Sequence, residues 1–247
     1  MKKQYGWIYV LPALMLLSIV AFGVLGVRSA VSEQRMQQEL SKIEWKMEPV
    51  SVGIYSRPLY QPESDTVKVY NQDKGGPRLF SSEGEILTDE DLDGRKPADA
   101  DQEPEVYRGP SSVRETFGED ILIWSDFSDD RALLYYKDKL VCVNGTGETV
   151  FEKKARIPER YIEGGTSETT QTITGLNRDG FRDGLAVFTL DGCKYGVLDR
   201  EGNVVIEPVF KGKYSLMVLK DGHVGVFYES IFCIGKVQAA TGGEADD

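Results

Sequence analysis

Cysteine and histidine are scarce in this 247-residue chain, which has three cysteines and one histidine. The three cysteines, at positions 142, 193 and 233, are too few for a disulfide scaffold, and nothing in their spacing requires a disulfide. His223 has no second histidine or cysteine pair to join it, which argues against a zinc site. We expect this histidine to lie exposed beside a turn. The sequence also lacks a nucleophile-elbow motif and a phosphate-binding loop.

Basic residues are outnumbered, because 29 lysines and arginines face 40 aspartates and glutamates and leave a net charge of −11. Nucleic acids and anionic lipid surfaces are bound mainly through lysine and arginine, so this balance argues against both as ligands. A strongly negative surface keeps a protein soluble and favours association with a basic partner.

A long apolar segment opens the chain, since residues 7–27 include 21 almost wholly apolar positions. About 20 such residues span the hydrocarbon core of a bilayer as a helix. Lys2 and Lys3 precede the segment, so the positive-inside rule places the N-terminus in the cytoplasm and the remainder outside. We therefore predict a cytoplasmic N-terminus and single-pass membrane anchor over residues 1–28, with residues 5–27 in contact with the membrane. A cleaved signal peptide is the alternative, and we favour the uncleaved anchor.

A polar helix with one apolar stripe is predicted to follow the anchor, over residues 29–48. Ser32 can cap its first turn, and the stripe consists of Met36, Leu40, Ile43 and Met47, spaced four, three and four residues apart. We interpret it as a membrane-proximal helix. A short dimerising coiled coil is the alternative, but the stripe is shorter than such a structure normally needs.

One sequence pattern recurs in the rest of the chain. Residues 185–205 align without a gap with residues 67–87, 118 positions upstream. Residues 127–152 match residues 181–207 with a slip of one position, and residues 221–227 look like a truncated fourth copy. We match Val224-Gly225 of that fourth copy to Tyr195-Gly196, since Gly225 lies 29 residues beyond Gly196. Repetition on this scale indicates one supersecondary unit copied to build a continuous core.

Each copy is predicted to form three short strands joined by two turns. In the clearest copy, residues 185–190 form a strand, and Asp191-Gly192 provides the left-handed backbone of a tight turn. Residues 195–199 form the second strand, Glu201-Gly202 the second turn, and residues 203–206 the third strand. By the same alignment, Asn144-Gly145-Thr146, which matches a glycosylation sequon, is better explained as a turn signal.

The third copy resembles the bacterial WG repeat. The resemblance rests on residues 194–208 preceded by residues 181–186, and it covers about 28 residues. The Trp-Gly pair that names the family is Tyr195-Gly196 here, and no copy keeps the tryptophan. The resemblance implies short antiparallel β units packed side by side. It implies no set of catalytic residues.

An acidic segment over residues 85–105 contains a candidate calcium site. Its first part has the spacing that opens a calcium-binding loop, with Asp89, Asp91 and Asp93 as the proposed ligands. The later positions depart from the EF-hand pattern, because Ala100 stands where a bidentate glutamate belongs. A solvated acidic insertion is the alternative interpretation. No other cofactor is expected.

The sequence thus predicts an all-β repeat domain over residues 49–236, either an open solenoid or a propeller-like ring, with a disordered tail over residues 237–247. We expect a binding or scaffolding module without enzymatic activity, acting on a protein or cell-envelope partner. Two alternatives stay open: an accessory or sensor subunit of a membrane complex, and an envelope enzyme. The enzyme's site would then lie in the insertions at residues 88–125 or 153–181.

Overall fold

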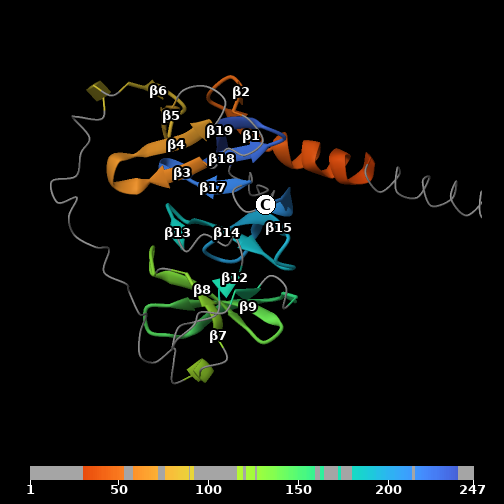
Figure 1. Ribbon diagram of the computed structural model, residues 1–247. Helices are drawn as coiled ribbons and strands as arrows, with labels where there is room; N and C mark the ends of the chain where they lie inside the picture. Colours follow the sequence, from red (N-terminus) through yellow and green to blue (C-terminus); the bar gives the residue numbers. More distant parts are fainter. Residues whose placement is uncertain are drawn as a thin grey trace, which may run out of the picture. The chain divides into compact units, whose positions relative to one another are not determined.

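A computed structural model gives the structure of the chain. It describes the following residues: 30–52, 58–71, 76–88, 90–91, 116–118, 121–125, 127–158, 162–163, 172–173, 180–212 and 215–238. The chain divides into two compact units, residues 1–41 and residues 42–247. The second, the β unit, contains every strand in the described part of the chain (Figure 1).

The first unit contributes a helix over residues 30–40. The predicted helix over residues 29–48 is therefore too long. Residues 43–45 instead form strand β1 (Ile43–Trp45), which pairs with a strand from the far end of the chain. Tertiary strand pairing thus decides the conformation of Ile43, although its spacing fits a helix. No helix in the described part of the chain is long and apolar enough to cross a membrane. The predicted anchor over residues 5–27 lies outside that part.

Antiparallel strands in four principal sheets make up the β unit (Figure 1). The first sheet consists of β3 (Pro58–Gln61), β4 (Thr66–Asn71), β5 (Gly76–Ser81) and β6 (Ile86–Leu87). The second consists of β7 (Ile121–Trp124), β8 (Arg131–Tyr136), β9 (Lys139–Asn144) and β10 (Thr149–Lys154). The third consists of β13 (Phe181–Arg182), β14 (Leu185–Thr189), β15 (Lys194–Asp199) and β16 (Val204–Lys211). The fourth consists of β17 (Leu216–Val218), β18 (His223–Tyr228), β19 (Ile231–Val237) and β1, with β2 (Val50–Ser51) also paired to β19. A separate hairpin joins β11 (Ile162–Glu163) to β12 (Thr172–Ile173).

The strands of three sheets follow the repeat predicted from the sequence. Moving the first copy by 118 positions places β5 on the bounds of β15 and the start of β6 on the start of β16. The second copy, with its slip of one position, places β9 on β15 in the same way. The predicted three-strand unit is therefore confirmed in these sheets. Each sheet adds one strand before the unit, namely β3, β7 and β13.

The fourth copy has a different register from the predicted one. Asp221 and Gly222 lie between β17 and β18, which is the turn between the first two strands of the sheet. Their structural counterparts are therefore Asp183 and Gly184, between β13 and β14. Gly225 lies in β18, which corresponds to β14, whereas Gly196 lies in β15, so the predicted match of Gly225 to Gly196 is wrong. The backbone angles agree with this assignment. Asp221 and Asp183 have φ values of 57° and 47°, and the glycines that follow have values of 73° and 81°.

The fourth sheet is completed by the first strand of the unit. Ile43 pairs with Val237 and Trp45 pairs with Gly235, so β1 occupies the outer position of a sheet whose other main strands come last in the chain. Gly235 permits this approach, because a Cβ atom there would lie 2.4 Å from Cγ2 of Ile43. The predicted domain start at residue 49 is thus too late, since the β unit begins at residue 42.

Buried clusters show which sheets pack together. The second and third sheets share a core that contains Leu133, Tyr135, Leu140, Cys142, Phe181, Ala186, Phe188 and Leu198. The fourth and first sheets share another, which contains Tyr60, Val67, Val69, Phe80, Met217, Phe232 and Ile234. Strand β17 of the fourth sheet lies against β14 and β15 of the third. The packing order is therefore second, third, fourth, first. The first sheet in the chain packs on the last, whereas a linear stack in chain order would separate them.

Tyr135 fixes the second sheet to the third. Its side chain is 1% exposed, and its hydroxyl group donates a hydrogen bond to the Thr189 carbonyl oxygen at 2.8 Å. The Tyr135 hydroxyl oxygen in turn accepts a hydrogen bond from the Thr189 N–H at 3.0 Å. Burial raises the pKa of Tyr135, so the phenol keeps its proton. One hydroxyl group thus satisfies both backbone groups of Thr189 within the core between the two sheets.

Candidate functional site

Only one of the three predicted calcium ligands lies in the described part of the chain. The Asp91 carboxylate accepts hydrogen bonds from the backbone N–H and the hydroxyl group of Thr88, both at 2.7 Å. The Asp91 N–H in turn donates to the Thr88 hydroxyl at 3.4 Å, which completes a reciprocal cap on a short helical turn. Asp89 and Asp93 lie outside the described residues. Across the residues that are described, no group of three or more His, Cys, Asp or Glu side chains could hold a metal ion.

The scarce histidine and cysteines are mostly buried. His223 is 6% exposed, and its Nδ1 lies 3.0 Å from the Lys220 carbonyl oxygen, so the predicted exposed position is wrong. It is the first residue of strand β18 and pairs with Lys236 of β19. All three cysteines are free thiols. Burial raises the pKa of Cys142 to about 12 and also raises that of Cys233.

A left-handed aspartate recurs where the first strand of each sheet turns into the second. These residues are Asp65, Asp129, Asp183 and Asp221, with φ values of 48°, 52°, 47° and 57°. Aspartate tolerates this region better than most residues, because its short side chain can hydrogen-bond to nearby backbone. The turn is therefore a common feature of all four sheets.

A second recurring turn joins the third and fourth strands in three sheets. Its glycines, Gly84, Gly147 and Gly202, have φ values of 88°, 85° and 86°, and each N–H donates to the carbonyl oxygen three residues earlier at about 3 Å. The first residue of each turn also accepts a hydrogen bond through its side chain from the N–H four residues later. These acceptors are Ser81, Asn144 and Asp199, at 3.1, 2.9 and 2.7 Å.

Antiparallel pairing places both turns at the same end of each sheet. We call this end the turn rim. It comprises residues 62–65, 81–85, 128–131, 144–148, 182–184, 199–203 and 220–222. Within a sheet the two turns are tied together by a side chain. In the first sheet Ser82 donates from its hydroxyl group to Oδ2 of Asp65 at 2.9 Å. In the second, the Gly145 N–H donates to Oδ1 of Asp130 at 3.1 Å.

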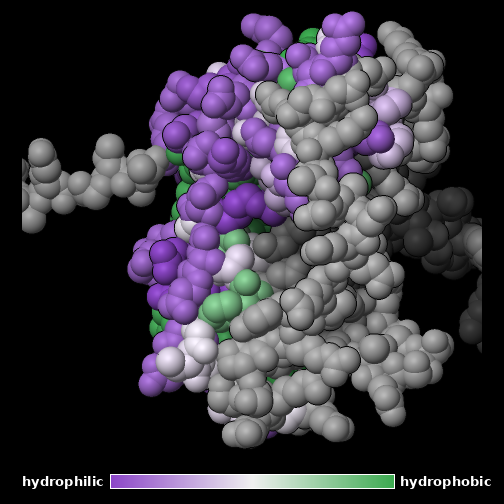
Figure 2. All heavy atoms as spheres, turned by 90° about the vertical axis from the view of Figure 1, so that its left-hand side faces the viewer, coloured by the Kyte–Doolittle hydropathy of each residue, from purple (hydrophilic) through white to green (hydrophobic). Residues whose placement is uncertain are grey.

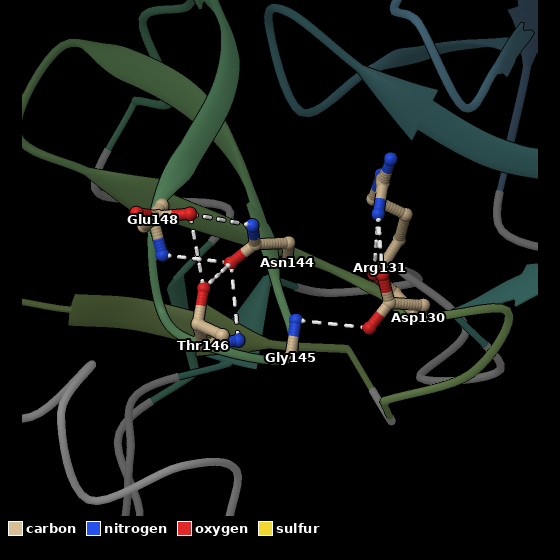
Figure 3. A network of polar contacts seen from close by, with 6 residues as sticks. All are labelled: Asp130, Arg131, Asn144, Gly145, Thr146 and Glu148. Carbon is tan, nitrogen blue, oxygen red and sulfur yellow. Dashed lines mark hydrogen bonds and ion pairs between the residues drawn. The ribbon is translucent and has the colours of Figure 1, made fainter.

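The rim of the second sheet carries the densest polar network (Figure 3). Oδ1 of Asn144 accepts from the Thr146 N–H at 3.1 Å, the Thr146 hydroxyl at 2.7 Å and the Glu148 N–H. Its Nδ2 donates to Oε2 of Glu148 at 3.0 Å, and Thr146 lies 3.1 Å from the same oxygen. These bonds lower the pKa of Glu148, with the bond from Asn144 as the largest cause. The sequon asparagine is therefore a turn residue, as predicted.

Hydrogen bonds also join the rim from one sheet to the next. The Gly184 N–H of the third sheet donates to Oδ2 of Asp129 in the second at 2.7 Å. The Asp221 N–H of the fourth sheet donates to Oδ2 of Asp183 in the third at 2.6 Å. The aspartate of one turn thus accepts from the backbone of the equivalent turn in the following sheet.

Arg182 connects three sheets at the rim. From β13 of the third sheet, its Nη1 donates to the Val218 carbonyl oxygen of the fourth sheet at 2.7 Å. Its guanidinium carbon lies 4.7 Å from the ring centroid of Tyr60, in the first sheet, which is a cation–π distance. The Tyr60 hydroxyl donates to Oδ1 of Asp65 at 2.8 Å. Burial and this hydrogen bond raise the pKa of Tyr60. The rim is therefore continuous from the second sheet to the first.

The turn rim is strongly acidic. Its ranges contain eleven acidic residues and four basic ones, which are Arg131, Arg182, Arg200 and Lys220. Several acidic side chains are exposed, among them Glu63, Glu83 and Glu201. The face of the molecule on the left of Figure 1, where the β3–β4 turn lies, is mostly hydrophilic over its described residues (Figure 2). The negative charge of the whole chain is thus strongly represented on this one surface.

Comparison with known proteins adds little to this description. No family model matches the sequence, and no curated protein matches it. Among solved structures, the chain is similar to the WD40 domain of SCAP from fission yeast, with 10% sequence identity and a TM-score of 0.23. The match covers 76% of this chain and 45% of that one, so the chain spans less than half the length of that structure. A TM-score this low has no bearing on fold or function.

Sequence reasoning found the glycine turns and missed the aspartate turns. Two of the latter carry an Asp-Gly pair, at Asp183-Gly184 and Asp221-Gly222, and this signal was available. It was obscured because Asp191-Gly192 offers the same pair at a different turn, where Gly192 has a φ value of 71°. The bonds between sheets had no sequence signal, because they join residues far apart in the chain. The insertions predicted to hold an enzyme site lie largely outside the described residues.

Proposed function

We propose that this chain is a binding or scaffolding module of the WG-repeat type, in which four linked sheets present the turn rim to a protein partner. The observation that carries the proposal is the continuity of the rim. Turns from all four sheets are hydrogen-bonded or stacked in series, so they offer one extended surface. The first sheet packs on the fourth, so the sheets do not stack in chain order, and both the solenoid and the propeller-like ring stay open.

The acidity of the rim favours a partner with a basic surface. Charge complementarity of this kind mainly accelerates association and selects among partners. The proposal includes the membrane anchor over residues 5–27, with the β unit outside the cytoplasm. A chain held in this way would act on a partner in or near the same membrane.

Crosslinking in native membranes tests this function. The tagged full-length chain is crosslinked in its own cells, captured proteins are identified, and the capture is repeated with Glu83→Lys and Glu201→Lys. Both side chains are exposed on the rim. Asp138→Lys is the matched control, because Asp138 is exposed at the opposite end of the second sheet. We expect one protein to be captured by the parent chain and the control but lost from both rim variants.

Three further outcomes decide the proposal. Capture that weakens as ionic strength rises would agree with recognition by exposed charges, which salt screens. Equal capture by the rim variants and the parent chain would show that the rim is not the binding surface. Extraction of the protein by alkaline carbonate would contradict the anchor, whatever the crosslinking shows.

A further inference from the structure

The turn rim contains one asparagine followed by glycine, Asn144-Gly145. We propose that Asn144 is a deamidation site that the folded turn protects from reaction. Asp130 restrains the Gly145 backbone nitrogen, which is the nucleophile of the reaction. This proposal does not depend on the binding function.

The reaction involves these two residues and water. The Gly145 backbone N–H gives its proton to water, and the nitrogen attacks Cγ of Asn144 and forms an N–C bond. The Cγ–Nδ2 bond then breaks, and Nδ2 takes a proton from water and leaves as ammonia. Water then opens the resulting succinimide, giving either aspartate or isoaspartate at position 144. Asparagine followed by glycine is suited to this step, because glycine has no side chain to hinder the attack and its backbone is the most permissive.

The nitrogen of Gly145 is directed away from the reaction. Its N–H donates to Oδ1 of Asp130 at 3.1 Å, so the electron pair left by deprotonation would point at that carboxylate. A second negative charge there is repelled by the first. Arg131 fixes Asp130 in place, with Nη1 2.9 Å from its Oδ2 and 2.7 Å from its backbone carbonyl oxygen (Figure 3).

The carboxamide of Asn144 is held equally firmly. Its oxygen accepts three hydrogen bonds and its nitrogen donates one to Glu148, so rotation toward the Gly145 nitrogen would break this network (Figure 3). Closure of the succinimide thus requires the turn to open, at the cost of several hydrogen bonds at once. We infer that the site reacts only when this part of the rim unfolds locally.

The product would change the rim. Aspartate at position 144 would place a second carboxylate against Glu148, which now accepts a hydrogen bond from the amide. Isoaspartate would also lengthen the backbone by one carbon within a tightly bonded turn. Either product would keep the turn from closing as before, so the modification would record past openings of the rim.

Peptide mapping of the full-length chain tests the proposal. The protein is incubated at neutral pH, and asparagine, aspartate and isoaspartate at position 144 are measured over time. We expect Asp130→Asn to speed deamidation several-fold, because it keeps a hydrogen-bond acceptor but removes the charge. Asp129→Asn is the matched control. It makes the same change one residue away, where the carboxylate accepts from Gly184 instead. We expect this control to react at the parent rate.

A second comparison uses only the parent chain, so its result does not depend on whether a variant folds correctly. The parent chain is incubated with and without denaturing urea, and we expect the unfolded chain to deamidate at position 144 several-fold faster. Equal rates in the two states would overturn the proposal, because the folded turn would then give no protection. Equal rates for Asp130→Asn and the parent, both folded by circular dichroism, would overturn the role of Asp130. Asn144→Gln should abolish the signal and confirms its location.

Discussion

The rim turns of the second and third sheets have the same backbone but opposite chemistry. In the second sheet Asn144 donates from its amide to the Glu148 carboxylate at 3.0 Å. In the third, the Asn203 amide donates to the Asp199 carboxylate at 2.9 Å. The amide thus belongs to the first residue of the turn in the second sheet and to the fifth residue in the third. Both turn glycines, Gly147 and Gly202, nevertheless have φ values near 86°. The turn backbone therefore requires a side-chain hydrogen-bond acceptor at its first residue and a left-handed glycine at its fourth. The carboxylate of the amide–carboxylate pair can stand at either the first or the fifth residue. Only the second sheet thereby acquires a reactive asparagine before glycine.

The largest effect should come from testing how strictly the glycine is required. A Cβ atom at position 202 would lie 2.6 Å from the Phe151 ring, whereas one at position 84 would lie 3.0 Å from Cβ of Met47, a milder contact. A left-handed alanine alone costs about 1–2 kcal/mol, and forcing a ring to move adds about 1–3 kcal/mol. We expect Gly202→Ala to lower the free energy of unfolding by about 2–5 kcal/mol and Gly84→Ala by about 1–2 kcal/mol. Urea denaturation measures both, and equal losses would show that Phe151 does not restrict the turn.

The next effect concerns how the second sheet holds the third. Tyr135→Phe would leave the buried N–H and carbonyl groups of Thr189 without the hydroxyl that satisfies both. We expect a loss of about 2 kcal/mol in unfolding free energy. Tyr136→Phe is the matched control on the next residue, where the side chain is only partly buried, and it should cost less than about 0.5 kcal/mol. Similar losses in the two variants would contradict the role assigned to the Tyr135 hydroxyl.

The smallest effect should come from exchanging the chemistry of the two turns. Asn144→Asp alone sets two carboxylates together, so we expect a lower urea midpoint at pH 7. Adding Glu148→Asn recreates the pair of the third sheet and should recover much of the loss. If the double variant is less stable than the single one, the two turns are not equivalent.

The difference in stability between the parent chain and Asn144→Asp should depend on pH in a defined direction. Glu148 has a folded pKa below its ordinary value of 4.5, mainly through the bond from Asn144. Its contribution to stability is complete above pH 4.5 and is lost as the pH falls through the lowered value. The difference between the parent chain and Asn144→Asp should therefore shrink below pH 4.5, as measured by urea midpoints from pH 3 to 7. A difference that stays constant over this range would exclude the carboxylate as its source.

The strand pattern within each copy could be predicted from the sequence because it depends on local chemistry. Alternating apolar residues and turn glycines act over a few positions, and residues 185–205 folded as their pattern indicated. The register of the fourth copy could not be settled in this way. Asp191-Gly192 and Asp183-Gly184 are chemically alike, and only the strands around them decide which is matched by Asp221-Gly222.

The site was less predictable than the fold because contacts between sheets create it. Asp129 contacts Gly184, and Arg182 contacts Tyr60, because separate sheets pack together. The spacing of these residues in the sequence does not predict that packing. The same is true of Ile43, which fitted a helical stripe and became a strand by pairing with Val237. Where a residue's partner lies far away in the sequence, the local sequence pattern did not predict its conformation or its contacts.

The pairing of β1 with β19 has a consequence for synthesis. Ile43 is synthesised 194 residues (237 − 43) before its partner Val237. At about 5–20 residues per second, this delay amounts to roughly 10–40 seconds. During that interval β1 has no edge to join, and the closing of so long a loop is the slowest kind of contact to form. The nascent chain must therefore keep Trp45 and its neighbours available until β19 has been made, and a chaperone would be of most use during this interval.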